Sequence, residues 1–149
     1  MPQEKINQML HSAAKLANFT VFDQAQQFEE FDGMGTTLVA VLVHNRHVTV
    51  AHVGDSRIYL LKNDGSFVRV THDHSLVQEL VDMGRINEEE AAVHAQRNII
   101  TRAVGTAFDV EPDVGNVAWS KGEVIQHGAY VAMVASAEFQ STIVDAFNA

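Results

Sequence analysis

The chain has 149 residues, a mass of 16.4 kDa and no cysteine, and its formal net charge is −9. The absence of cysteine excludes a disulfide framework, a thiolate zinc site and a cysteine nucleophile. The acidic balance argues against broad binding to nucleic acid or to anionic membranes. No apolar run reaches the ~18 residues of a membrane-spanning helix, and charged residues break up the N-terminal segment, so no secretory signal is expected. We therefore expect one globular domain in the cytoplasm.

The chain is expected to open with a helix. Apolar residues recur at helical spacing over residues 2–18, which predicts an amphipathic helix. The polar segment 23–30 either extends this helix or forms a loop. Two later segments also predict helices, because 75–83 ends before a glycine and 87–94 starts with an asparagine followed by a glutamate at the capping-box position. A short helix is expected at 141–147.

Between these helices the sequence favours antiparallel strands. β-Branched, alternating segments predict them at 36–43, 47–53, 57–61 and 66–70. We interpret these four as a meander with tight turns at 44–46 and 63–65 and a bulge or bend at Gly54-Asp55-Ser56. Alternation in 47–53 places Val48, Val50 and His52 on one face and His47, Thr49, Ala51 and Val53 on the other. Further strands are expected at 114–119 and 130–134 with a turn at 121–122, whereas 99–104 is ambiguous.

Four segments occur in one order and together resemble a known family. They are Gly35-Thr36-Thr37-Leu38, His52-Val53-Gly54-Asp55-Ser56-Arg57, Asp73-His74-Ser75-Leu76-Val77 and Thr101-Arg102-Ala103-Val104-Gly105. From about residue 33 to residue 122, the chain resembles the bacterial metal-dependent Ser/Thr protein phosphatases of the phosphatase 2C type. The resemblance implies an α+β fold, an antiparallel β-sandwich flanked by helices and truncated at both ends. It makes residues 1–149 a single partial domain, with a flap-like helical segment at 76–98 that shapes substrate access.

The resemblance also implies a binuclear Mg or Mn site, in which carboxylates hold metals that activate a water. The family takes its main metal carboxylates from an early acidic strand, an Asp-Gly loop, a late Ser-Asp-Gly segment and a terminal Asp-Asn. We expect the early elements to lie before Met1 and the terminal pair beyond Ala149. The late metal position falls on Ala137, which cannot bind a cation. Asp55 matches the family's ligand for an additional third metal and is the one candidate metal ligand; no catalytic residue is assigned.

Other interpretations of these residues stay open. Asp55 could instead bond to nearby backbone amides or pair with Arg57. Asp32, in an Asp-Gly-Met-Gly segment, is expected to be a turn residue rather than a ligand. The eight histidines could bind Zn, Ni or Cu, but we favour surface or interfacial positions for them. The residues considered for such a site are His44, His47, His52, His72 and His74. In the segment 73–75, either Asp73 or Ser75 could cap the following helix.

Three functions follow as expectations. The first is a metal-dependent protein Ser/Thr phosphatase that uses Mg or Mn, with impaired or absent activity in this chain. The alternative is a non-catalytic phosphatase-fold module that binds or scaffolds partners, and a weaker one is a histidine-based transition-metal binder. The expected partner is a phosphoprotein or a regulatory protein. Exposed sheet edges also favour a homodimer.

Overall fold

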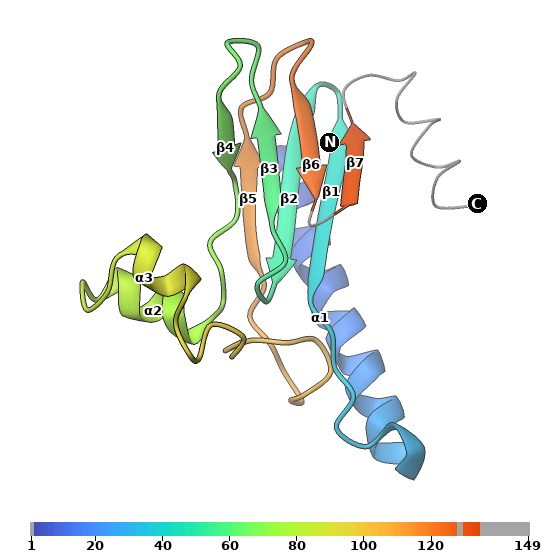
Figure 1. Cartoon of the computed structure of the whole chain (residues 1–149). Coiled ribbons are helices and arrows are strands. Elements are labelled where there is room, and N and C mark those ends of the chain that lie inside the picture. The colour runs from blue at the N-terminus through green and yellow to red at the C-terminus, as the bar shows by residue number, and fades with distance from the viewer. Residues whose placement is uncertain (1, 128–129, 135–149) are drawn as a thin grey trace.

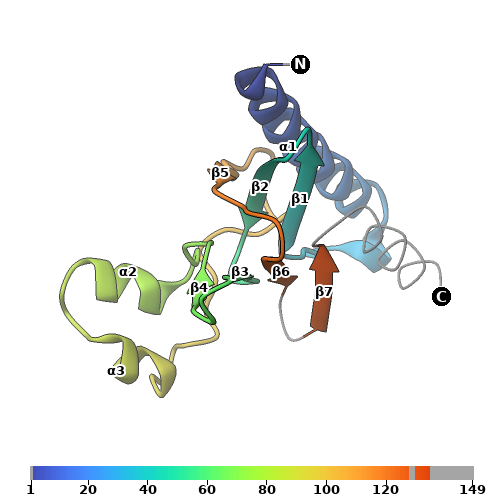
Figure 2. The ribbon, with the colours of Figure 1, turned by 90° about the horizontal axis from the view of Figure 1, so that it is seen from above.

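The computed structural model describes residues 2–127 and 130–134, and these form two antiparallel sheets packed face to face (Figures 1 and 2). One sheet has the strand order β1-β2-β5 and the other the order β4-β3-β6-β7. The strands are β1 (Leu38–His44), β2 (His47–Val53), β3 (Ile58–Leu61), β4 (Phe67–Arg69), β5 (Asp113–Val117), β6 (Val124–His127) and β7 (Tyr130–Val134). The helices are α1 (Gln3–Gln27), the 3-10 turn η1 (Glu29–Phe31), α2 (Leu76–Asp82) and α3 (Glu88–Ala92). The expected helix at 141–147, as well as Ala137, lies outside the described residues.

The core lies between the two sheets and explains why the strands alternate. Val48 and Val50 of β2 meet Ile58 and Leu60 of β3 and Ile125 of β6 in one buried cluster. The opposite face of β2 packs under α1, where Thr49 is buried and accepts a hydrogen bond from the Gln3 side chain. The face assignment made from alternation in 47–53 is therefore confirmed, because Val48 and Val50 face the other sheet whereas Thr49 faces α1.

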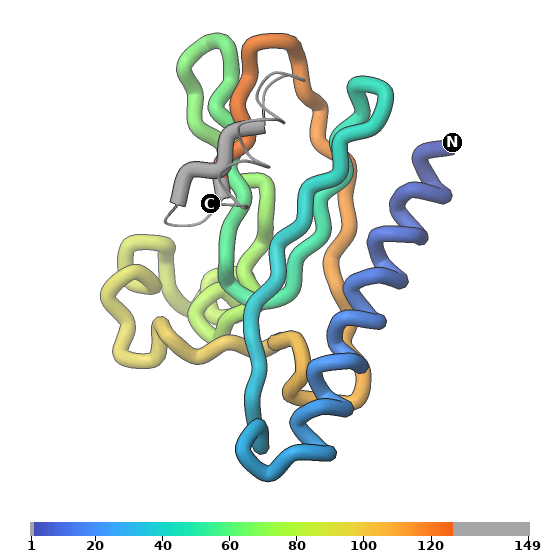
Figure 3. The backbone as a smooth tube through the Cα atoms, turned by 90° about the vertical axis from the view of Figure 1, so that its right-hand side faces the viewer, coloured from blue at the N-terminus to red at the C-terminus, as the bar shows by residue number. Residues whose placement is uncertain are grey.

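Helix α1 runs along the outer face of the β1-β2-β5 sheet (Figure 3). It continues to Gln27, so of the two alternatives left open for the polar segment, the structure shows an extension of the helix, up to Gln27. The reason is tertiary, because Asn18 is fully buried and its side chain binds the 105–108 loop. Its Oδ1 accepts from the Gly105 amide at 2.7 Å, and its Nδ2 donates to the carbonyls of Ala107 and Phe108.

The chain changes sheets at Gly54, which corrects the expected meander. β2 pairs with β1 and β5, whereas β3 pairs with β4 and β6. Residues 54–57 form the corner between the two layers, and Gly54 has φ +103° there. Only glycine adopts that conformation readily. The pattern of 47–61 had suggested one interrupted strand, but the interruption marks the crossing from one sheet to the other.

The turns and helix starts expected from sequence are present. Asn45 and Arg46 close the β1–β2 hairpin, and both have the positive φ that a two-residue type I′ turn requires. The register of this hairpin runs from Leu38↔Val53 to His44↔His47. The Ser75 side chain, not Asp73, caps α2. Asn87 forms the expected capping box with Glu90 at the start of α3.

Two segments after α3 are not settled by the sequence: the strand β6 and the segment 99–104. β6 was not predicted, because its four residues carry only two apolar side chains in succession and show no alternation. It nevertheless lies in the middle of its sheet, between β3 and β7. The ambiguous segment 99–104 forms no strand and makes two isolated bridges, Ser75↔Ile100 and Thr36↔Val104.

No helix in the described part of the chain is both long and apolar enough to span a bilayer.

Candidate functional site

A pocket of about 420 Å³ lies between the Gly54–Arg57 corner and the helices α2 and α3. These helices stand away from the sandwich on the side of β4 (Figures 1 and 2). The charged residues that line the pocket are Asp55, Asp73, Glu88, Arg57, Arg69 and Arg97. Asp55 is half-buried and, among the described residues, its carboxylate has no hydrogen bond or ion pair. The pocket therefore presents one carboxylate whose oxygens remain available.

The alternative in which Arg57 pairs with Asp55 is not what the structure shows. Arg57 holds Asp73 instead, with its Nε at 2.9 Å and 3.1 Å from the two carboxylate oxygens and its terminal nitrogen at 2.6 Å from Oδ2. The hydrogen bond to Asp73 raises the pKa of Arg57. Because Asp73 is 8% exposed, this pair fixes the corner to the segment that leads into α2.

The helical segment above the pocket is anchored by further polar contacts from β4 and from the loop that joins β4 to α2. Arg69 donates to Gln78 Oε1 at 3.2 Å and lies 3.7 Å from Glu88. His72 contacts Asp82 at 2.7 Å. At the base, the Leu76 amide bonds to the Ile99 carbonyl and the Thr101 amide to the His74 carbonyl. These two bonds join the chain entering the segment 76–98 to the chain leaving it, so the two ends of the segment are held side by side.

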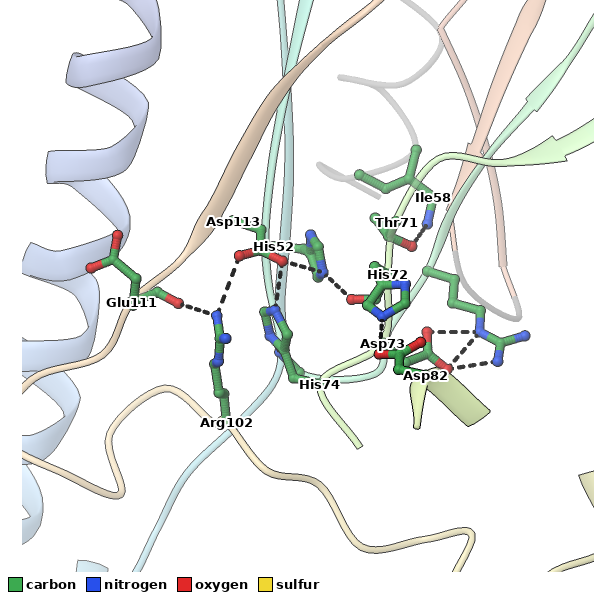
Figure 4. A network of polar contacts seen from close by, with 12 residues as sticks. His52, Ile58, Thr71, His72, Asp73, His74, Asp82, Arg102, Glu111 and Asp113 are labelled. Atoms are coloured by element: carbon green, nitrogen blue, oxygen red, sulfur yellow. Dashed lines mark hydrogen bonds and ion pairs between the residues drawn. The ribbon is translucent and has the colours of Figure 1, made fainter. Parts of the chain in front are cut away.

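Behind the corner, two histidines and an aspartate form a second polar cluster (Figure 4). His52 of β2 and His74 are both buried and stack with ring centroids 4.6 Å apart. His74 Nε2 lies 2.8 Å from Asp113 Oδ2, and His52 Nε2 lies 2.7 Å from the His72 carbonyl. Arg102 closes the cluster at 3.3 Å from Asp113 Oδ1. These two histidines contradict the expectation of surface positions, because the fold buries both rings beneath the corner.

The ligand atoms of His52, His74 and Asp113 all lie within 4.8 Å of one another, but the hydrogen bonds disfavour a metal there. The Gly54 amide donates to His74 Nδ1 at 3.0 Å, so the ring proton sits on Nε2. That nitrogen therefore donates to Asp113, and His52 Nε2 must likewise donate to a carbonyl. Both nitrogens that point into the cluster carry protons, which a metal would have to displace. The cluster is a hydrogen-bond network.

Burial lowers the pKa of His74, and the hydrogen bond that His74 donates to Asp113 offsets this effect only in part. For Asp113 burial acts in the raising direction, but the hydrogen bond from His74 and the neighbouring positive charges bring its pKa below the usual range. Asp113 is therefore charged and His74 neutral near neutral pH. Neutral His74 is the state that can accept the Gly54 amide.

This pKa shift predicts a pH dependence of stability. The unfolded chain protonates His74 near its ordinary pKa of 6.5, whereas the folded chain resists protonation. The unfolded state therefore binds more protons as the pH falls below 6.5, and the free energy of unfolding decreases until the pH reaches the folded pKa. Urea unfolding at pH 7.5, 6.5 and 5.5 should show this decrease in the wild type and a smaller one in His74→Asn. Equal slopes for the two proteins would contradict the prediction.

The other residues considered from the sequence do not join these clusters. Asp32 is exposed in the turn after η1. His47 is exposed, and His44 contacts the neighbouring Asn45. Sequence reasoning missed Asp113, which lies 39 positions from His74 in the chain, and it missed the partner of Arg57. No local pattern marks either contact, because each joins segments that only the sandwich brings together.

This sandwich, with a helical segment over a carboxylate-bearing corner, is an arrangement shared with bacterial serine/threonine phosphatases. The profile of the family described as Protein phosphatase 2C matches residues 2–140, and the chain belongs to this family. It is 49% identical over 111 residues to a putative protein phosphatase 2C-type of Streptococcus pyogenes, covering 74% of this chain and 44% of that protein. It is 40% identical over 102 residues to protein phosphatase PhpP of Streptococcus pneumoniae, covering 68% and 41%.

Solved structures agree with this assignment. The serine/threonine phosphatase of Staphylococcus aureus superposes with a TM-score of 0.74 at 42% identity, over 78% of this chain and 45% of that one. The serine/threonine phosphatase of S. agalactiae gives a TM-score of 0.76 at 39% identity, over 83% and 50%. The expected α+β, phosphatase 2C-like sandwich is confirmed. The chain spans about half the length of these relatives.

Proposed function

We propose that this chain contributes the flap-bearing part of a phosphatase that removes phosphate from serine or threonine in a protein substrate. Its family and the names of its relatives, which include serine/threonine phosphatases, support this proposal. The observation that carries it is the placement of Asp55 in the pocket between the corner and the helical segment. The partner is a phosphoprotein, or a regulatory protein that occupies the same pocket.

The donor chemistry of Asp55 fits a hard divalent cation. A relative, the catalytic domain of the phosphatase PstP, has a structure in complex with 2 manganese ions. In this chain Asp55 offers an oxygen ligand, while the neighbouring Asp73 is engaged by Arg57. Mn or Mg bound at Asp55 would complete its shell largely with water. Such an ion supplies Lewis-acid chemistry to a bound water or phosphoryl oxygen.

The described residues do not fit a binuclear carboxylate site. Within them, the one group of three or more metal-competent side chains is His52, His74 and Asp113, which the hydrogen bonds hold in another role. We propose that the 149-residue chain alone has little or no phosphatase activity and binds manganese weakly through Asp55.

Manganese titration by calorimetry, together with turnover of p-nitrophenyl phosphate, tests this proposal. We expect weak binding by the wild type, loss of that binding in Asp55→Asn, and no manganese-dependent turnover. Glu89→Gln is the matched control, because Glu89 is an exposed carboxylate of α3 outside the pocket. Robust turnover that disappears in Asp55→Ala would contradict the proposed inactivity. Equal manganese binding by Asp55→Asn and the wild type would contradict the ligand role.

A non-catalytic binding module is the second candidate, and the mixed charge of the pocket favours it. Three arginines and three carboxylates surround the pocket, which suits a charged peptide independently of any metal. Phosphopeptide binding without manganese binding would select this candidate.

The homodimer remains part of the proposal, because β1 is an edge strand that pairs with β2 alone among the described strands. Light scattering at high protein concentration tests it, and a monomer would count against it.

A further inference from the structure

One histidine holds the corner that carries Asp55. The His74 backbone amide donates to the Gly54 carbonyl at 3.0 Å, and the Gly54 amide donates to His74 Nδ1 at 3.0 Å. Both peptide groups that flank the Gly54 Cα are therefore bound by the same residue. Residues 54–57 belong to no strand, so no sheet hydrogen bonds fix them. Both bonds act where the chain leaves Gly54 toward Asp55, whereas the other bonds at this corner are made by the side chains of Ser56 and Arg57.

The His74 ring is itself held in one orientation and one tautomer. Its Nε2 donates to Asp113 Oδ2 at 2.8 Å, and Arg102 lies 3.3 Å from the other oxygen of Asp113. His52 stacks on the ring at an interplanar angle of 14°. A charged acceptor on Nε2 favours the tautomer whose Nδ1 is free to accept, which is the tautomer that Gly54 needs. The hydrogen bonds thus run continuously from Arg102 through Asp113 and His74 to Gly54.

We infer that His74, oriented by Asp113, is a positioning residue that sets the placement of the Asp55 carboxylate in the pocket. The inference rests on the proposed role of Asp55 as a cation ligand. His74 touches Gly54 and not the pocket, so it acts through the backbone. A purely structural role for His74 would make any substitution that disturbs packing equally harmful. A positioning role makes the Nδ1 acceptor the critical feature.

Two substitutions separate the functions of the two ring nitrogens. In His74→Asn the side-chain oxygen can take the place of Nδ1 and accept the Gly54 amide. In His74→Gln the longer side chain can reach Asp113 but offers no acceptor at the Nδ1 position. His72→Asn is the matched control, because His72 is an exposed neighbouring histidine whose ring contacts Asp82 rather than Gly54.

The first measurement needs no metal. Nitrogen-15 NMR of the wild type should show the Nε2–H tautomer of His74, and amide exchange should show a protected Gly54. We expect His74→Gln to speed Gly54 exchange roughly tenfold, the effect of losing one hydrogen bond. His74→Asn and His72→Asn should leave that exchange near the wild-type rate. An Nδ1–H tautomer in the wild type would overturn the inference even if a variant failed to fold. Equal Gly54 exchange in the Asn and Gln variants would also overturn it.

The second measurement links the corner to the pocket. Manganese titration should show weaker binding by His74→Gln and near wild-type binding by His74→Asn, while the two variants differ little in thermal midpoint. Equal manganese affinity in the two variants, with Gly54 exchange changed only in the Gln variant, would overturn the link to Asp55. If the wild type bound no manganese, the proposed metal role would fail, and so would the link. The tautomer and exchange data would then show separately whether His74 holds the corner.

Discussion

Replacing Arg57 with alanine should destabilise the fold by roughly 3 kcal/mol, the lower end of the range for breaking a buried ion pair. The lower end applies because the Arg57 side chain is 39% exposed, whereas that of Asp73 is 7% exposed. Without Arg57, the Asp73 carboxylate stays buried without its cation, and its desolvation is no longer compensated. Urea unfolding of the wild type and Arg57→Ala measures the loss. Arg85→Ala, at an exposed arginine, is the control and should stay close to the wild type.

A double-mutant cycle identifies the buried charge as the cause. Asp73→Asn removes the charge while keeping the shape of the side chain, so adding it to Arg57→Ala should recover part of the lost stability. Strict additivity of the two losses would mean that the unpaired carboxylate is not responsible. A loss below about 1 kcal/mol in Arg57→Ala would place the pair among exposed surface ion pairs and would contradict the prediction.

Replacing Gly54 with alanine is the second large effect. The new Cβ would lie 2.5 Å from Thr37 Cγ2 and 2.9 Å from Thr37 Cβ, at a residue with φ +103°. Backbone strain and overlap together should destabilise the protein by roughly 3 kcal/mol or more. Gly65→Ala provides the comparison, because φ is +85° there and nothing lies within 4 Å of the added Cβ. At Gly65 only the cost of the left-handed backbone conformation applies, so we expect Gly65→Ala to lower the free energy of unfolding by about 1 kcal/mol.

The methyl group of Thr37 allows the overlap to be tested by itself. Thr37→Ser removes Cγ2 but keeps the hydroxyl that bonds to Ser56 at 2.6 Å. Combined with Gly54→Ala, it should restore part of the stability lost in the single variant. Thermal unfolding of the four proteins measures this. Equal losses in Gly54→Ala and Gly65→Ala would show that close packing at the corner contributes nothing.

How far the sequence predicts this protein depends on the range of the interactions. The Asn45–Arg46 turn and the α3 capping box were predictable because each is made by residues within four positions of one another. The two faces of β2 were predictable because side chains alternate along any strand. The ordered segments that resemble the phosphatase family gave the fold class, which the relatives confirm.

The site was predicted only in part. Asp55 was named from its segment and does line the pocket. Whether it binds a metal stays a prediction. The Arg57–Asp73 pair and the His74–Asp113 contact were not foreseen. The chain has 19 acidic residues, and the sequence does not indicate which of them lies next to a given arginine or histidine.

By itself, the sequence determined the local geometry: where helices begin, where hairpins turn and which face of a strand is apolar. These features arise from backbone dihedral preferences and hydrogen bonds between near neighbours. Only the tertiary structure decided that the chain changes sheets at Gly54, that α1 continues to Gln27 and that β6 lies inside a sheet. It also decided that His74 faces Gly54 on one side and Asp113 on the other. Those outcomes depend on burial against distant segments, and burial becomes defined only when the two sheets close over a common core.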